Sequence, residues 1–276
     1  MKLLYSITAA LLLAACSPES EKMDLVSAAP ATFTAVPLAA NPNKIVVTST
    51  TSGGFIWKWQ YGASGTSAKE KDTLTFSKKG NYNIQLTVFT RGGFTTAAQA
   101  VTIANDLPAV DILKGGNMEA GSEAHWTLLN TGGAQTTIAI AGGVMRFSNT
   151  ANSNGGIYQA INVIAGKEYT FSGKVKGAGA TNSWFEVVFG TTAPVQGADY
   201  SGTKWNSMNT WSGCGILPFN GDLAEIGCDG DGKGKGGKMK FTATGKVYMV
   251  IKAGSSGGTL GTGGIEIDDI KFLEEQ

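Results

Sequence analysis

Apolar side chains recur at every second position of this sequence, in short stretches separated by glycine-rich turns. Tyr82, Ile84, Leu86 and Val88 alternate with polar residues, and the same period returns between positions 157 and 163. Successive side chains of a β-strand point to opposite faces, so this period predicts strands with one buried face. Several such strands at regular spacing predict an all-β protein built from sandwiches.

The charge composition excludes several classes of function. Lys and Arg number 22 and Asp and Glu 21, for a formal charge of +1. Nucleic-acid-binding proteins usually carry a basic excess, so we expect no nucleic-acid partner. Charged residues make up only 16% of the chain, and 39 of its 276 residues are glycine, which favours an extracellular β-protein. The single histidine, His125, leaves little room for histidine-based catalysis.

The first sixteen residues have the features of an export signal. Lys2 precedes an apolar stretch that is too short to span a membrane and that ends in small residues. Positions 13–16 (LAAC) resemble the lipobox of bacterial lipoproteins. The resemblance implies a signal peptide over residues 1–15, lipidation of Cys16 and a flexible tether over residues 16–40. The alternative is an ordinary signal peptide with a chance cysteine.

The residues after Cys16 indicate a destination. Positions 17–24 (SPESEKMD) have no Asp directly after the cysteine and are rich in acidic residues. They resemble the export signal of surface lipoproteins of the Bacteroidetes type, which implies an outer-membrane lipoprotein that faces the exterior. The alternative is a plain polar tether.

The two remaining cysteines, Cys214 and Cys228, lie close together in the sequence. In an oxidising compartment such a pair predicts a disulfide, and the alternative is two free thiols. A zinc site is not expected, because neither a histidine nor a further cysteine lies near.

Residues 41–107 form the first predicted unit. Positions 59–62 (WQYG), 74–76 (LTF) and 80–88 (GNYNIQLTV) resemble a PKD domain. The family's acidic residues after the first motif are replaced here by Ala63 and Ser64. The resemblance implies a rigid immunoglobulin-like sandwich that acts as a spacer.

Residues 108–276 form a second, larger unit. The resemblance is to jelly-roll carbohydrate-binding modules of the type 4/9/22 group, which have a galactose-binding-like fold. An ordered set of short motifs carries it: positions 115–121 (GGNMEAG) with Trp126, 155–160 (GGIYQA), 165–172 (AGKEYTFS) and 265–270 (IEIDDI).

The combination of lipobox, PKD-like unit and jelly roll resembles the surface glycan-binding lipoproteins of polysaccharide-utilisation systems. The resemblance implies a non-enzymatic protein that captures a polysaccharide, with β-glucan such as laminarin favoured, and passes it to an outer-membrane importer. One alternative is an adhesin or structural lipoprotein that binds a protein. Another is a glycoside hydrolase, for which Glu186 with Asp199 or Glu225 would be the carboxylate pair.

Acidic residues near both ends of the second unit suggest a metal site. The resemblance implies a structural Ca²⁺ held by Glu119 and Asp269, with Asp268 as a substitute, away from the glycan. Ca²⁺ prefers oxygen ligands, and neighbouring Asp side chains on a strand point to opposite faces, so only one of the two would bind. The alternative is solvated acidic residues at a strand end.

Tryptophans identify the candidate glycan site, because flat indole rings stack on the apolar faces of sugars while polar neighbours bind the hydroxyls. Positions 199–214 are predicted to form a long loop that carries Trp205 and Trp211 among Asn, Ser, Thr and Gly residues. Trp184 and Glu186 are expected on the outer face of a strand. The alternatives are a loop tryptophan anchored on the core and Trp184 in a second core layer. The candidate glycan-binding residues are Trp184, Glu186, Tyr200, Trp205, Trp211 and Tyr248.

Overall fold

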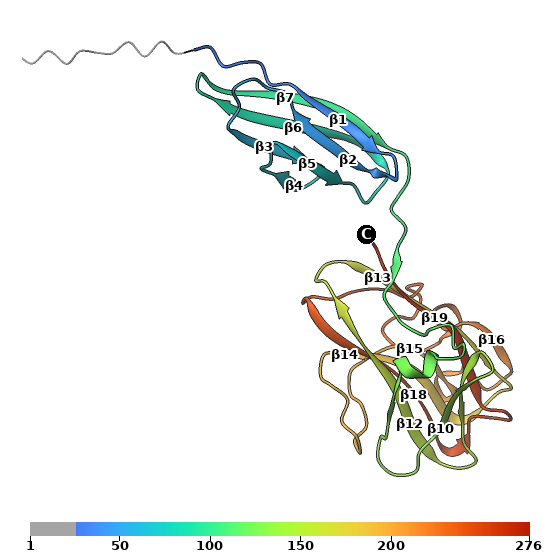
Figure 1. The fold of residues 1–276 in the computed structure, drawn as a ribbon. Helices are drawn as coiled ribbons and strands as arrows, with labels where there is room; N and C mark the ends of the chain where they lie inside the picture. Colours follow the sequence, from blue (N-terminus) through green and yellow to red (C-terminus); the bar gives the residue numbers. More distant parts are fainter. Residues whose placement is uncertain (1–25) are drawn as a thin grey trace, which may run out of the picture. The chain divides into compact units, whose positions relative to one another are not determined.

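The computed structural model describes residues 26–276, so the predictions for the signal peptide and Cys16 lie outside the described residues. The chain divides into two compact units, Met1–Asp106 and Leu107–Gln276. Both units consist of antiparallel β-sheets (Figure 1), and the predicted all-β fold class, an immunoglobulin-like sandwich followed by a larger jelly roll, is confirmed. Within residues 26–276, no helix is long and apolar enough to cross a membrane.

The first unit packs a three-stranded sheet against a four-stranded sheet. Trp59 is buried between them together with Ile45, Leu74 and Leu86, so the tryptophan fills the core. The strand order of the three-stranded sheet is β1 (Phe33–Leu38), β2 (Asn41–Ser49), β5 (Lys71–Thr75). The order of the four-stranded sheet is β4 (Gly65–Ser67), β3 (Ile56–Tyr61), β6 (Gly80–Thr90), β7 (Gly93–Ile103).

Part of the range 16–40, over which a tether was predicted, is a β-strand. Strand β1 lies inside that range and pairs with β2 from Phe33↔Ser49 onward. Phe33 contacts Trp59 edge-on, with ring centroids 5.1 Å apart. The prolines and alanines of this stretch hid the strand, because Pro37 interrupts its alternation close to a shift in the strand register.

The second unit is a sandwich of a seven-stranded and a five-stranded sheet. The seven-stranded sheet contains β10 (Thr137–Ala141), β11 (Val144–Ser148), β19 (Ile265–Glu274), β13 (Glu168–Gly177) and β16 (Phe219–Asp222), with β17 (Lys238–Lys240) paired to β13 and β8 (Val110–Asp111) to β19. The five-stranded sheet has the order β15 (Thr203–Asn209), β14 (Thr181–Gly190), β18 (Gly245–Thr259), β12 (Ser153–Val163), β9 (Thr127–Leu129). Three short helices complete the unit: η1 (Ser122–His125), η2 (Thr210–Ser212) and α1 (Leu223–Ile226).

Alternation along β14 separates the core from the outer face of the five-stranded sheet. Phe185, Val187 and Phe189 are buried between the two sheets. Trp184 and Glu186 are therefore on the opposite, outer face, as the sequence predicted. The neighbouring strand β18 places Gly254 opposite Trp184 and Lys252 opposite Glu186.

Part of the predicted loop over positions 199–214 is a strand. β15 pairs with β14 from Thr203 to Asn209, with a shift of register between Val187 and Val188. The shift is a bulge that breaks the alternation, so the strand was not visible as a period in the sequence. The long loop lies before this strand, over positions 191–202, and covers the sheet. We call this loop the strap.

Candidate functional site

A pair of tryptophans lies at the outer face of the five-stranded sheet. Trp184 from β14 and Trp211 from η2 have ring centroids 6.2 Å apart and planes inclined by 29°. Trp211 is 58% exposed, whereas Trp184 is half-buried. The Trp184 ring lies over Gly254, where a Cβ atom would come within 2.5 Å of it. The absence of a side chain at Gly254 therefore lets the indole lie against the sheet.

Hydrogen bonds hold Trp211 in place. The side chain of Asn209 accepts a hydrogen bond from the Trp211 amide at 3.0 Å and so caps η2. The Thr210 hydroxyl accepts from the Ser183 amide at 2.9 Å and donates to the Ser183 carbonyl at 3.2 Å. These contacts attach the helix to β14, next to Trp184, and orient the pair before a ligand arrives.

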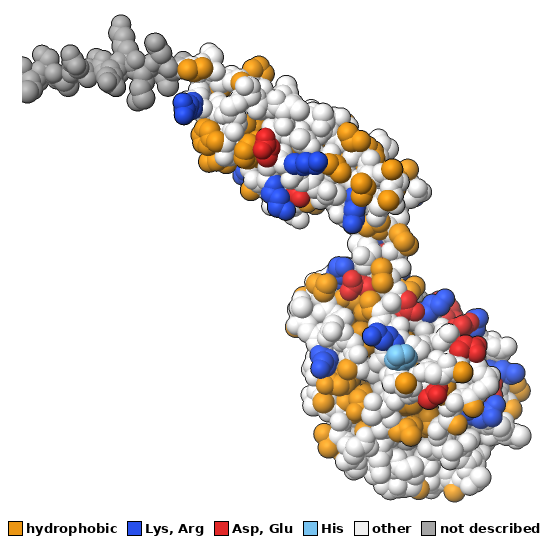
Figure 2. All heavy atoms as spheres, viewed as in Figure 1, with side chains coloured by type: hydrophobic (Ala, Val, Ile, Leu, Met, Phe, Trp, Pro, Cys, Tyr) orange, Lys and Arg blue, Asp and Glu red, His pale blue; other side chains and the backbone are white. Residues whose placement is uncertain are grey.

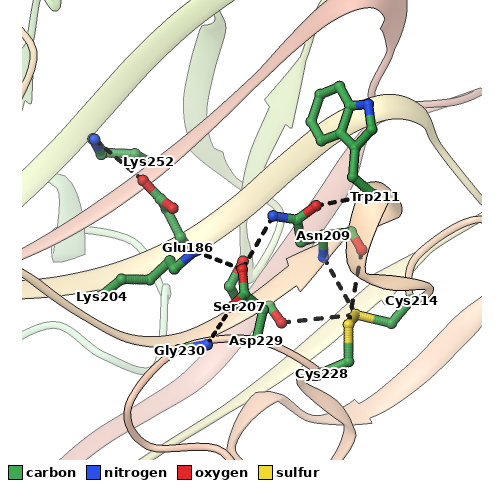
Figure 3. A network of polar contacts seen from close by, with 10 residues as sticks. All are labelled: Glu186, Lys204, Ser207, Asn209, Trp211, Cys214, Cys228, Asp229, Gly230 and Lys252. Atoms are coloured by element: carbon green, nitrogen blue, oxygen red, sulfur yellow. Dashed lines mark hydrogen bonds and ion pairs between the residues drawn. A yellow bond between two sulfur atoms is a disulfide. The ribbon is translucent and has the colours of Figure 1, made fainter.

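A disulfide and an ion pair brace the same loop (Figure 3). Cys214 and Cys228 are bonded, as predicted, with Cα atoms 5.9 Å apart. A loop of this size contributes about 3 kcal/mol in the chain-entropy model. The Asp229 carboxylate accepts hydrogen bonds from Lys204 Nζ at 2.5 Å and Asn209 Nδ2 at 3.1 Å. The Lys204 ammonium lowers the pKa of Asp229, so this carboxyl group stays charged at neutral pH.

A buried lysine organises the centre of the outer face. The Lys252 side chain is only 6% exposed, and its ammonium lies 3.2 Å from Glu186 Oε1 and 3.0 Å from Asp199 Oδ1. It also donates to the Tyr200 carbonyl at 3.0 Å. Lys252 therefore joins β14 and β18 to the strap, and Figure 3 shows it pointing toward Glu186.

The strap covers a small apolar cluster beyond Lys252. Tyr200 is 7% exposed and packs with Leu129, Val188 and Val250, while its hydroxyl donates to the Thr192 carbonyl at 2.9 Å. Tyr248 is half-buried against the same cluster. Tyr200 and Lys252 thus hold the strap on the sheet, and the Tyr200 ring is buried instead of facing a ligand.

Trp205 is half-buried and lies apart from the tryptophan pair. Its ring packs against the main core, and Lys235 Nζ lies 4.9 Å from the ring centroid. The indole borders a cavity of about 390 Å³ that Phe189 and Phe241 also line. No ring contact among the described residues joins Trp205 to Trp184 or Trp211.

Each predicted calcium ligand has its own surroundings in the structure, and calcium binding there stays a prediction. Glu119 is exposed, Asp269 forms an ion pair with Lys174, and Asp268 Oδ1 accepts from the Asp269 amide at 2.6 Å. Among residues 26–276, no three His, Cys, Asp or Glu side chains gather closely enough to hold an ion. The start and end of the unit do meet, because the Ile270 amide donates to the Gly116 carbonyl at 2.8 Å.

The chemistry available here favours stacking over bond cleavage. The tryptophan pair offers an apolar aromatic surface, and the exposed Ser212 follows Trp211 in the chain. A glycosidase needs one carboxyl group to donate a proton and another to act as base or nucleophile. Glu186 and Asp199 instead both form ion pairs with the Lys252 ammonium.

Three supporting residues were not part of the predicted site. Asn209 is the last residue of β15, and its capping role was not visible without the helix that it caps. Gly254 looks like any other glycine until the Trp184 ring is placed over it. Lys252 lies opposite Glu186 on the outer face, and its burial depends on the strap, which is about 50 residues away in the sequence.

No protein-family model matches the chain, and no curated protein matches it. Several solved structures do match the chain. The PKD1 domain of the metalloprotease PrtV from Vibrio cholerae is 25% identical, with a TM-score of 0.25 over 28% of this chain and 99% of that one. A family 4 carbohydrate-binding module is 15% identical, with a TM-score of 0.34 over 59% of this chain and 99% of the other. A carbohydrate-binding module in complex with β-1,4-galactotriose is 16% identical, with a TM-score of 0.34 over 60% of this chain and 99% of the other. With TM-scores below 0.5, the function proposed next rests on the geometry of the site.

Proposed function

We propose that the second unit binds a polysaccharide without cleaving it, and that Trp184 and Trp211 form the binding surface. The observation that carries the proposal is the exposed, hydrogen-bonded tryptophan pair. A solvent-facing indole costs free energy unless a ligand covers it, and its flat apolar face suits stacking on a sugar ring. Asn209 and Thr210 hold Trp211 in position through their hydrogen bonds to the Trp211 amide and to Ser183.

The finer reading is that the protein captures glycan at the cell surface for an outer-membrane importer, with a β-glucan such as laminarin favoured. The sequence resemblance to surface glycan-binding lipoproteins supports this role.

The experiment that tests the proposal has two readouts. The chain from residue 16 on, with Cys16→Ser, is applied to a glycan array, and each bound glycan is titrated by calorimetry. Release of reducing sugar is then measured on the same glycans. Binding without release is the expected result. Release would instead indicate a hydrolase, and a protein ligand with no glycan bound would indicate an adhesin.

Membrane attachment through Cys16 is a prediction of its own. Acyl chains anchor because each buried CH₂ contributes about 0.8 kcal/mol. Replacing Cys16 with Ser should leave the protein unacylated and move it from the membrane fraction to the soluble fraction of cells. A Cys16→Ser protein that stays in the membrane fraction would show that another feature holds it there.

A structural Ca²⁺ ion is a further prediction, and it would have to displace Lys174 from Asp269. An ion that binds only the folded state stabilises it by mass action, so EDTA should lower the melting temperature and leave glycan affinity largely unchanged. Elemental analysis of the untreated protein supplies the control. An unchanged melting temperature, with no metal found, would remove Ca²⁺ from the description.

A further inference from the structure

The first unit exposes an apolar patch at one end of its four-stranded sheet. Phe55, Ile56, Phe89 and Phe94 are 54%, 52%, 37% and 64% exposed. Ile56, Phe89 and Phe94 lie side by side, and together with Phe55, which precedes Ile56 in the chain, we call them the phenylalanine patch. Ile56 pairs with Phe89 and Phe89 with Phe94 across three strands, and the two phenylalanine rings are 5.7 Å apart. The Phe55 amide donates to the Phe89 carbonyl at 3.1 Å, which places the Phe55 backbone next to this row.

This patch does not contribute to the core of the unit. Alternation in β3 and β6 sends Trp59, Leu86 and Val88 inward, where they are buried. Ile56 and Phe89 occupy the outward positions of the same strands. Clustered phenylalanines on an outer face are unusual for a soluble domain and indicate a surface that another phase or molecule covers.

The described chain begins beside the patch. Val26 and Ala28 pass so close to Gly92, in the β6–β7 turn, that a side chain at Gly92 would collide with their backbone. The Thr95 hydroxyl donates to the Ala29 carbonyl at 2.8 Å. Figure 2 shows hydrophobic side chains at this end of the unit. Strand β7 starts here at Gly93 and ends at Ile103, so the connection to the second unit leaves from the opposite end.

The short stretch of chain between Cys16 and Val26 limits the distance of the phenylalanine patch from Cys16. Nine residues lie between Cys16 and Val26, and the ten peptide units that join them reach at most about 36 Å. If Cys16 is lipidated, the patch is confined within that distance of the bilayer. A short tether gives an effective concentration in the millimolar range, at which even a weak contact is occupied for much of the time.

The charges of this sheet suit a lipid surface. The four strands β3, β4, β6 and β7 contain no Asp or Glu, and Lys58 follows Ile56 on the same outward face. Arg91 lies in the turn between Phe89 and Phe94. Aromatic side chains that enter the boundary between headgroups and acyl chains, with cations beside them, are the pattern of peripheral membrane binding.

We propose that the phenylalanine patch docks the first unit on the bilayer surface, as a second contact beside the lipid anchor. The proposal rests on the proposed anchor at Cys16 and is independent of glycan binding. The tethered unit then lies against the membrane instead of projecting freely from it.

The first test uses the chain from residue 16 on with Cys16→Ser, mixed with vesicles of phosphatidylcholine and phosphatidylglycerol and sedimented. Each Phe→Ser substitution in the patch should lower the partition coefficient on the order of tenfold, since each removes one inserted ring. The matched control is Val36→Ser/Leu38→Ser, two exposed apolar residues on β1 of the other sheet. Its partition coefficient should equal that of the parent.

The second test restores the tether, in case the free protein partitions too weakly to measure. Cys214 and Cys228 are bonded to each other, so the Cys16 thiol can be coupled selectively to a maleimide lipid in the same vesicles. Backbone amides of residues 87–96 should then exchange with deuterium more slowly than in free protein, and the Phe55→Ser/Phe89→Ser/Phe94→Ser variant should lose that protection. Equal exchange in the two proteins overturns the proposal.

Two other outcomes would assign the patch differently. Concentration-dependent dimers that the triple variant abolishes, with no vesicle effect, would make the patch an interface between two copies. Loss of glycan affinity in the triple variant would make it a sugar site. Either result overturns membrane docking, and glycan binding that survives in the variant leaves the proposed function intact.

Discussion

Replacing Trp211 with Ala should weaken glycan binding by roughly tenfold to a hundredfold, and replacing Trp184 as well should weaken it further. By analogy with nucleobases on aromatic side chains, one stacking contact contributes about 1–3 kcal/mol. The two effects should not simply add, because Trp211 packs on Trp184 and its removal also frees the remaining ring to move. Isothermal calorimetry on a glycan identified by the array measures both variants.

The matched control is Trp205→Phe, which changes a tryptophan of the same unit that packs against the core beneath Lys235. Its affinity should remain close to that of the parent. Trp211 is 58% exposed, so Trp211→Ala should leave the melting temperature nearly unchanged, and a loss of affinity cannot then be attributed to unfolding. Full affinity in the Trp184→Ala/Trp211→Ala protein would refute the proposed surface. The cavity between Trp205 and Phe241 would then become the better candidate.

Lys252→Met should destabilise the second unit by about 3 kcal/mol, because it leaves Glu186 largely buried without its counter-ion. The Glu186 side chain is 15% exposed, whereas Asp199 is 56% exposed and regains water at little cost. The strap should also loosen, since Lys252 donates to the Tyr200 carbonyl. Chemical denaturation measures the first effect, and proteolysis within residues 191–202 measures the second.

A second substitution separates the loss of the charge pair from the loss of packing. In Lys252→Met/Glu186→Leu no buried charge is left alone, so most of the lost stability should return. Lys174→Met provides the surface comparison, because its ion pair with Asp269 is exposed and should contribute little. If Lys252→Met is as stable as Lys174→Met, the buried ion pair does not hold the strap.

The fold class could be predicted from local pattern because alternation is a property of neighbouring residues. The two-residue period along β14 places Phe185, Val187 and Phe189 on the buried face. The same period places Trp184 and Glu186 on the outer face. The disulfide between Cys214 and Cys228 could also be predicted, because the two cysteines lie close together in the sequence. Strand β15 was missed where a bulge at Trp205 interrupts the period.

The site depended on contacts that no local pattern contains. Tyr200 and Trp205 have the same residue chemistry as a sugar-binding aromatic, but the strap buries the first and the core holds the second. Trp184 and Trp211 became a pair because the fold brings η2 to β14 over a glycine. Residue type and period determined the sheets and the candidates in this sequence. Tertiary packing alone decided which aromatic rings solvent can reach, because exposure depends on what the rest of the chain covers.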